Sequence, residues 1–182
     1  MTAPATTPRI APGDRGDVGA FAWGFAALAG RVSGTGPPNL FLTLGRHRRL
    51  FRGWLRFAGR LMPRGTLPRR DTELVILRVA HVRSCDYERT HHERLGRKAG
   101  LSAAELARVA DGPDAPGWSP REQAVLRATN ALLRDHDIDD ETWRALHGHL
   151  GDQGCIELCL LVGHYDMLAG TINALRIQPD TH

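Results

Sequence analysis

Residues Glu73 to His92 read ELVILRVAHVRSCDYERTHH. The first half of this stretch, up to Ala80, is almost continuously apolar, which predicts a helix that is buried on most of its sides. Cys85, Glu88 and His92 then follow at spacings of three and four residues. On an α-helix these spacings bring side chains to one face, so a thiol, a carboxylate and an imidazole are expected together.

A turn in the middle of this stretch predicts a helical hairpin, in which one helix ends near Arg83 and the next begins near Cys85. Glu73 lies ten residues before the turn and His92 about nine after it, so both lie about 13–15 Å from the turn. We therefore expect Glu73, Glu88 and His92 to meet around one cavity, with Cys85 at its edge, where they can transfer protons. The alternative is that Glu73 is only a first-turn carboxylate favoured by the helix dipole.

This pattern, followed by the segment AGLS at residues 99–102, resembles the carboxymuconolactone decarboxylase and alkylhydroperoxidase D-like superfamily. Four further segments look like the longer single-chain members of that superfamily: Pro38–Phe41, Arg64–Asp71, Gly112–Ser119 and Gly163–Leu168. The resemblance extends roughly from Pro8 to Asp180. It implies an all-α fold, namely an alkylhydroperoxidase D-like helical domain.

The sequence departs from the hydroperoxidase branch of this superfamily at one position. That branch has a glutamate, then Cys-x-x-Cys, then a histidine, and its second cysteine reacts while the first resolves. Cys85 matches the first cysteine, but Glu88 stands at the second position. Glu73 and His92 match the residues that relay protons. An intramolecular dithiol cycle therefore cannot run here, which favours acid–base chemistry.

The leading expectation is an acid–base enzyme that acts on a small organic acid, lactone or carbonyl compound, by decarboxylation or isomerisation. His92 would shuttle the proton, Glu88 and Glu73 would orient it or act as the base, and Cys85 would line the site. One alternative is a thiol peroxidase with peroxiredoxin-type activity, in which Cys85 reacts and an external thiol resolves it. Another is a non-catalytic assembly protein that keeps the fold without the chemistry.

Tyr87 and His164 are the candidate substrate-binding residues, although either could instead pack in the core. Glu73, Glu88 and His92 could also ligate a metal ion, but the resemblance implies neither a metal nor a cofactor, and we expect neither. Cys155 and Cys159 stand four residues apart in an apolar helix and are expected to pack as small hydrophobic residues. Arg78 in the apolar helix is expected to pair with a buried carboxylate, or else to hold a substrate carboxylate.

The composition predicts a compact protein of 182 residues, with an extended arm over residues 1–16 and one helical domain over residues 17–182. We expect no transmembrane span and no signal peptide, and a cytoplasmic location because three cysteines make no disulfide framework. The formal charge is +4, carried mostly by arginine. Arginines between residues 46 and 70 are expected to form a solvated face rather than a nucleic-acid site.

The resemblance implies a homo-oligomer, either a dimer or a trimer, that takes a small-molecule substrate without nucleic acid or membrane partners. Candidate interface elements are the helix over residues 48–62 and the final helix. Helical periodicity and breaker residues predict further helices. These cover residues 17–32, 39–44, 119–134, 139–151 and 153–175, and a short one follows Ser102. Ser102 with Glu105, and Ser119 with Glu122, are expected to form capping boxes, and Asn39 to cap its helix.

Overall fold

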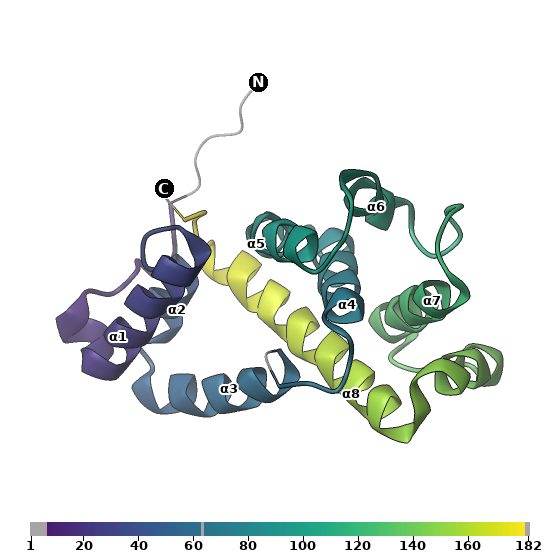
Figure 1. Ribbon diagram of the computed structural model, residues 1–182. Coiled ribbons are helices and arrows are strands. Elements are labelled where there is room, and N and C mark those ends of the chain that lie inside the picture. The colour runs from purple at the N-terminus through teal and green to yellow at the C-terminus, as the bar shows by residue number, and fades with distance from the viewer. Residues whose placement is uncertain (1–6, 63, 181–182) are drawn as a thin grey trace. The chain divides into compact units, whose positions relative to one another are not determined.

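The computed structural model describes residues 7–62 and 64–180, and within these residues all regular structure is helical (Figure 1). The all-α prediction is therefore confirmed. Helix bounds follow the chain in this order: α1 Arg15–Ser33, α2 Asn39–Leu44, α3 Arg48–Leu61, α4 Arg69–Val82, α5 Asp86–Lys98, α6 Ala103–Arg108, the 3₁₀ helix η1 Val109–Asp111, α7 Pro120–Asp135 and α8 Asp140–Leu175.

The chain forms two compact units. One unit comprises Met1–Phe57 together with Thr171–His182, and the other comprises Ala58–Gly170. Residues 1–6 of the predicted N-terminal arm lie outside the described residues. The rest of the arm is not helical up to Asp14, and within the first unit Arg9 donates from its backbone and side chain to the carbonyls of Leu175 and Ala174.

The first unit is held together by aromatic side chains from α1, α2 and α3. Phe41 lies edge-on to Phe25 with ring centroids 5.1 Å apart, and Phe51 stacks on Trp54 at 5.8 Å. Two local details differ from expectation. α1 is interrupted at Gly19, whose φ of 80° is accessible mainly to glycine. Asn39 does not cap α2, because its side-chain amide donates to the carbonyls of Gln178 and Pro179.

The second unit is built around α4, which contacts both α5 and α7 (Figure 1). Its apolar core joins α4 to the segments that follow α5. The buried members are Leu74, Leu77, Leu101, Val109, Trp118 and Leu126. Apart from Arg78, every residue of α4 from Asp71 to Ala80 is buried, as its continuous apolar pattern predicts.

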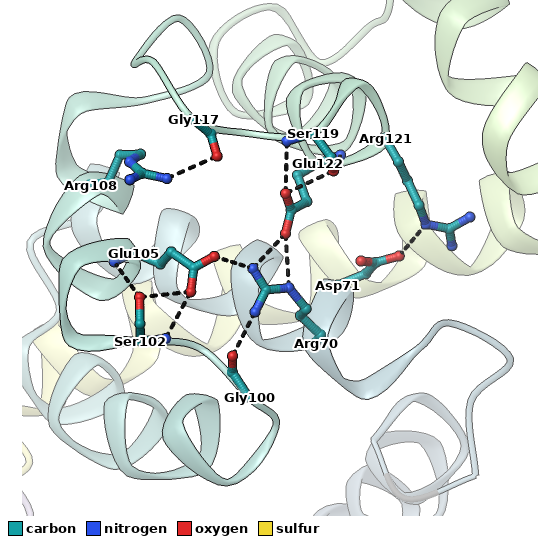
Figure 2. A network of polar contacts seen from close by, with 10 residues as sticks. All are labelled: Arg70, Asp71, Gly100, Ser102, Glu105, Arg108, Gly117, Ser119, Arg121 and Glu122. Atoms are coloured by element: carbon teal, nitrogen blue, oxygen red, sulfur yellow. Dashed lines mark hydrogen bonds and ion pairs between the residues drawn. The ribbon is translucent and has the colours of Figure 1, made fainter.

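A single guanidinium connects the starts of three helices in this unit (Figure 2). The predicted capping boxes at Ser102 and Ser119 are both present. In each box the glutamate that closes it also pairs with Arg70: Glu105 through one nitrogen, and Glu122 at 2.7 and 2.8 Å. Hydrogen bonds from Arg70 and Ser102 lower the pKa of Glu105 to about 2. Arg70 is therefore a structural ion-pair residue and not part of a purely solvated face.

The expected pairing of Arg78 with a buried carboxylate is wrong. Its guanidinium donates to the carbonyls of Val109 and Ala110 at 2.8 and 2.9 Å, and to the side-chain oxygen of Asn130 at 2.8 Å. The partners are thus neutral oxygens at η1 and on α7 rather than a carboxylate. Desolvation by burial lowers the pKa of this guanidinium.

α8 is a long helix that changes direction at Gly151, where φ is 63°. This break matches the predicted boundary between two helices at residues 151–153. By length and composition α8 would suffice to cross a membrane, with a mean hydropathy of 1.3 over its most apolar window. Half of that window is buried inside the protein.

Candidate active site

The predicted hairpin is present, with α4 ending at Val82 and α5 beginning at Asp86. Two features make the turn tight. Ser84 adopts a left-handed conformation with φ of 49°, and the backbone N–H of Cys85 donates to the carbonyl of Ala80 at 2.8 Å. The chain thus reverses within three residues, and α5 returns along α4.

The hairpin places one imidazole between two carboxylates. His92 Nδ1 lies 2.7 Å from Glu73 Oε2, and His92 Nε2 lies 3.2 Å from Glu88 Oε2. All three side chains are buried, with Glu73 at 0% exposure, Glu88 at 4% and His92 at 6%. The alternative for Glu73 is therefore wrong, because this residue lies beyond the first turn of α4 and its side chain binds His92.

The two carboxylates favour the charged form of His92. Burial acts to lower the pKa of the imidazole, because it removes water from the cation. Hydrogen bonds to Glu73 and Glu88, together with their negative charges, outweigh burial and raise the pKa to about 9. His92 is therefore an imidazolium at neutral pH, and both of its nitrogens are donors.

The second oxygen of Glu73 faces Arg69, which lies one helical turn earlier on α4. Arg69 Nη2 is 2.6 Å from Glu73 Oε1, although the geometry does not qualify as a hydrogen bond. Arg69 also donates from Nη1 to the carbonyl of Met62 at 3.0 Å. The spacing of four residues between Arg69 and Glu73 could have indicated this ion pair. Arg69 is instead part of the arginine-rich stretch that is expected to face solvent.

Cys85 is the residue that precedes the first turn of α5, and it is buried with 1% exposure. Desolvation by burial raises the pKa of the thiol to about 11, with a further rise from the charges of Glu88 and Asp86. The backbone N–H groups of Glu88 and Tyr87 act in the opposite direction but do not compensate. The thiol is therefore protonated at neutral pH, which disfavours its action as a nucleophile.

α8 contributes two buried aromatic side chains to this site. The ring of Tyr165 meets His92 edge-on, with centroids 5.3 Å apart and an interplanar angle of 88°. His164 lies 5.1 Å from Tyr165 by ring centroids and is close enough to Glu88 for that carboxylate to oppose the effect of burial, which lowers the pKa of His164. His164 thus lies near Glu88, and its role in substrate binding stays a prediction. The sequence did not single out Tyr165.

Tyr87, the other candidate substrate-binding residue, is buried, and its ring packs 5.0 Å from that of His91. Cys155 is fully buried and Cys159 partly so. Over residues 7–62 and 64–180, the histidine, cysteine, aspartate and glutamate side chains form no cluster arranged to hold a metal ion.

Residues 48–131 match the model of the carboxymuconolactone decarboxylase family, and this range contains Glu73, Cys85, Glu88 and His92. Over this part of the chain the protein is similar to that family. No match was found among the curated proteins. The resemblance that the sequence indicated is therefore confirmed by the family model over residues 48–131.

Solved structures share the fold of this chain at low sequence identity. A peroxidase-related protein with an alkylhydroperoxidase core from Ralstonia eutropha JMP134 is 18% identical, with a TM-score of 0.85, covering 98% of this chain and 94% of its own. A peroxidase-related protein from Silicibacter sp. TM1040 is 14% identical, with a TM-score of 0.82, covering 98% and 95%. The debrominase Bmp8 is 16% identical, with a TM-score of 0.77, covering 93% and 91%. These likenesses establish the fold.

Proposed function

We propose that this protein is an acid–base enzyme that acts on a small organic acid, lactone or carbonyl compound, by decarboxylation or isomerisation. The observation that carries the proposal is the imidazolium of His92 held between Glu73 and Glu88. A buried histidine with an oriented carboxylate on each nitrogen is suited to give and receive a proton repeatedly.

The two contacts of His92 suggest different roles for its nitrogens. The Nδ1 contact with Glu73 is the shorter, at 2.7 Å, and Glu73 is fully buried, so this contact would fix the ring. The Nε2 contact with Glu88 is longer, at 3.2 Å, so Nε2 is the nitrogen that would serve a substrate. Nε2–H would then protonate an enol-like carbon or oxygen, and Glu88 would accept a proton from the substrate or return one to His92.

Deuterium uptake tests this proposal before the substrate is identified. The protein would be incubated in D₂O with a panel of small carboxylic acids, lactones and carbonyl compounds, and ¹H NMR would follow exchange next to the carbonyl and any loss of CO₂. Glu88→Gln keeps the shape of the side chain but cannot carry the proton, so we expect a rate loss of about 10²–10⁴-fold. Cys85→Ser should have a mild effect.

The second candidate is a thiol peroxidase that uses Cys85 with an external resolving thiol. It is favoured by the peroxidase-related relatives and by the backbone N–H groups of α5 that face the sulfur. The debrominase relative, whose cysteine-to-alanine variant was crystallised with 2,3,4-tribromopyrrole, also makes thiol chemistry worth testing. Burial and the raised pKa of Cys85 weigh against it.

A peroxide assay separates the two candidates. With hydrogen peroxide and a small dithiol, the acid–base proposal predicts no turnover above that of Cys85→Ser. Cys159→Ser, which keeps Cys85, is the matched control. Rapid peroxide consumption that Cys85→Ser abolishes and Glu88→Gln leaves nearly normal would support the peroxidase and contradict the acid–base enzyme.

A further inference from the structure

Seven side chains with titratable or charged groups meet at the candidate site. They are Arg69 and Glu73 from α4, Cys85, Glu88 and His92 from α5, and His164 and Tyr165 from α8. Burial raises the pKa of the Cys85 thiol and that of the Tyr165 phenol, and it lowers that of His164, so these three groups are neutral at pH 7. The charges that must balance are therefore those of Arg69, Glu73, Glu88 and His92.

The contact with His92 compensates only one of the two carboxylate oxygens of Glu73. Its side chain is fully buried, and only Oε2 is bonded to the imidazole. Among the described residues, Oε1 has no hydrogen-bond donor in good geometry, and its compensation is the guanidinium of Arg69 at 2.6 Å. A buried carboxylate oxygen without a nearby positive charge is costly, and such a group tends to take up a proton instead.

A count of charges shows what Arg69 contributes. Glu73, His92 and Glu88 with a single titratable proton, on His92, carry a net charge of −1, and Arg69 brings the cluster to zero. Without Arg69 the same three groups reach zero only if they bind a second proton. That proton must reside on a carboxyl group, either Glu73 or Glu88.

We infer that Arg69 is a positioning residue of the candidate site, whose guanidinium keeps Glu73 ionised and so limits the buried Glu73–His92–Glu88 set to one titratable proton. It acts through Glu73 and touches no reacting atom. Its connection to the carbonyl of Met62 holds the guanidinium in place, although the side chain is 39% exposed. Any effect of Arg69 on turnover rests on the proposed acid–base function. The number of titratable protons on Glu73, His92 and Glu88 depends only on these contacts.

The proton count can be measured directly. Protein labelled with ¹³C at the glutamate side-chain carboxyls would be titrated by NMR, with Glu73 and Glu88 assigned by their Gln variants. We expect both carboxyls to be ionised at pH 7 in the wild type. In Arg69→Gln one of the two should be protonated at pH 7, and Arg69→Lys should restore the wild-type pattern. Arg97→Gln, which removes an exposed arginine of α5 that lies 3.8 Å from Glu93, is the matched control and should change neither carboxyl.

The inference fails if Arg69→Gln is folded by circular dichroism and its two carboxyls titrate as in the wild type. If Arg69→Gln does not fold at pH 7, the double variant Arg69→Gln with Glu73→Gln decides, because it removes both charges. Recovery of the fold in the double variant supports the inference, and equal destabilisation of the two overturns it. Since no turnover is measured, this result is independent of whether the proposed reaction is correct.

Discussion

His92 is buried beside two carboxylates, and this arrangement links its charge to the stability of the fold. Its pKa is raised from an ordinary 6.5 to about 9, so the folded protein binds this proton more tightly than the unfolded chain does. The resulting stability is fully present below pH 6.5 and is lost as the pH rises through 9. The free energy of unfolding should therefore fall over this interval.

Urea unfolding at several pH values tests this linkage. His92→Gln should remove most of the decrease between pH 6.5 and 9, because glutamine does not titrate. His81→Gln is the control, since His81 is an exposed residue of α4, and it should leave the decrease in place. A His92→Gln protein that keeps the wild-type pH dependence would show that His92 is not the cation we describe.

The turn between α4 and α5 contains a residue in an unfavourable backbone conformation. Ser84 has a φ of 49°, a conformation that costs a residue with a Cβ about 1–2 kcal/mol relative to the right-handed form. Ser84→Gly should therefore raise the free energy of unfolding by about 1 kcal/mol, reduced somewhat by the greater freedom of glycine in the unfolded chain. Ser84→Ala keeps the Cβ and should give no gain. Equal effects of glycine and alanine would contradict this account.

The hairpin and the helix starts could be predicted from the sequence, because helical spacing and capping boxes are local properties. Spacing alone brought Glu88 and His92 to one face, and the short turn placed Glu73 opposite them. Tyr165 could not be found in this way, since its position against His92 depends on tertiary packing. Arg69 could have been found from its spacing of four residues to Glu73. The interruption of α1 at Gly19 could not be predicted either. Glycine adopts helical and positive-φ conformations about equally readily, and the sequence does not indicate which one occurs.

The proposed homo-oligomer needs an exposed apolar surface through which its subunits can associate. α8 has one after its break, where Ile156, Leu160 and Met167 are 60%, 48% and 55% exposed and recur at helical spacing. The first two of them also line an open groove of about 310 Å³, with Leu61 and Thr66 from the other side. Exposed apolar side chains gathered on one helix face are typical of subunit contacts.

We expect a dimer or trimer by light scattering at micromolar concentration. Leu160→Glu should shift the protein towards the monomer, because a charge would be buried in the contact. Ala145→Glu, an exposed position of α8 before Gly151, should leave the mass unchanged. A wild-type protein that is monomeric at micromolar concentration would refute the oligomer.

Arg70 should make local unfolding at three helix starts of the second unit cooperative. Helix ends usually fray independently, but one guanidinium here binds Glu105 and Glu122, which close the capping boxes of α6 and α7, while itself standing in the first turn of α4 (Figure 2). Loss of any one of these contacts weakens the others. Amide protons at the three helix starts should therefore exchange with solvent as one cooperative group, with a common opening free energy, rather than as three local events.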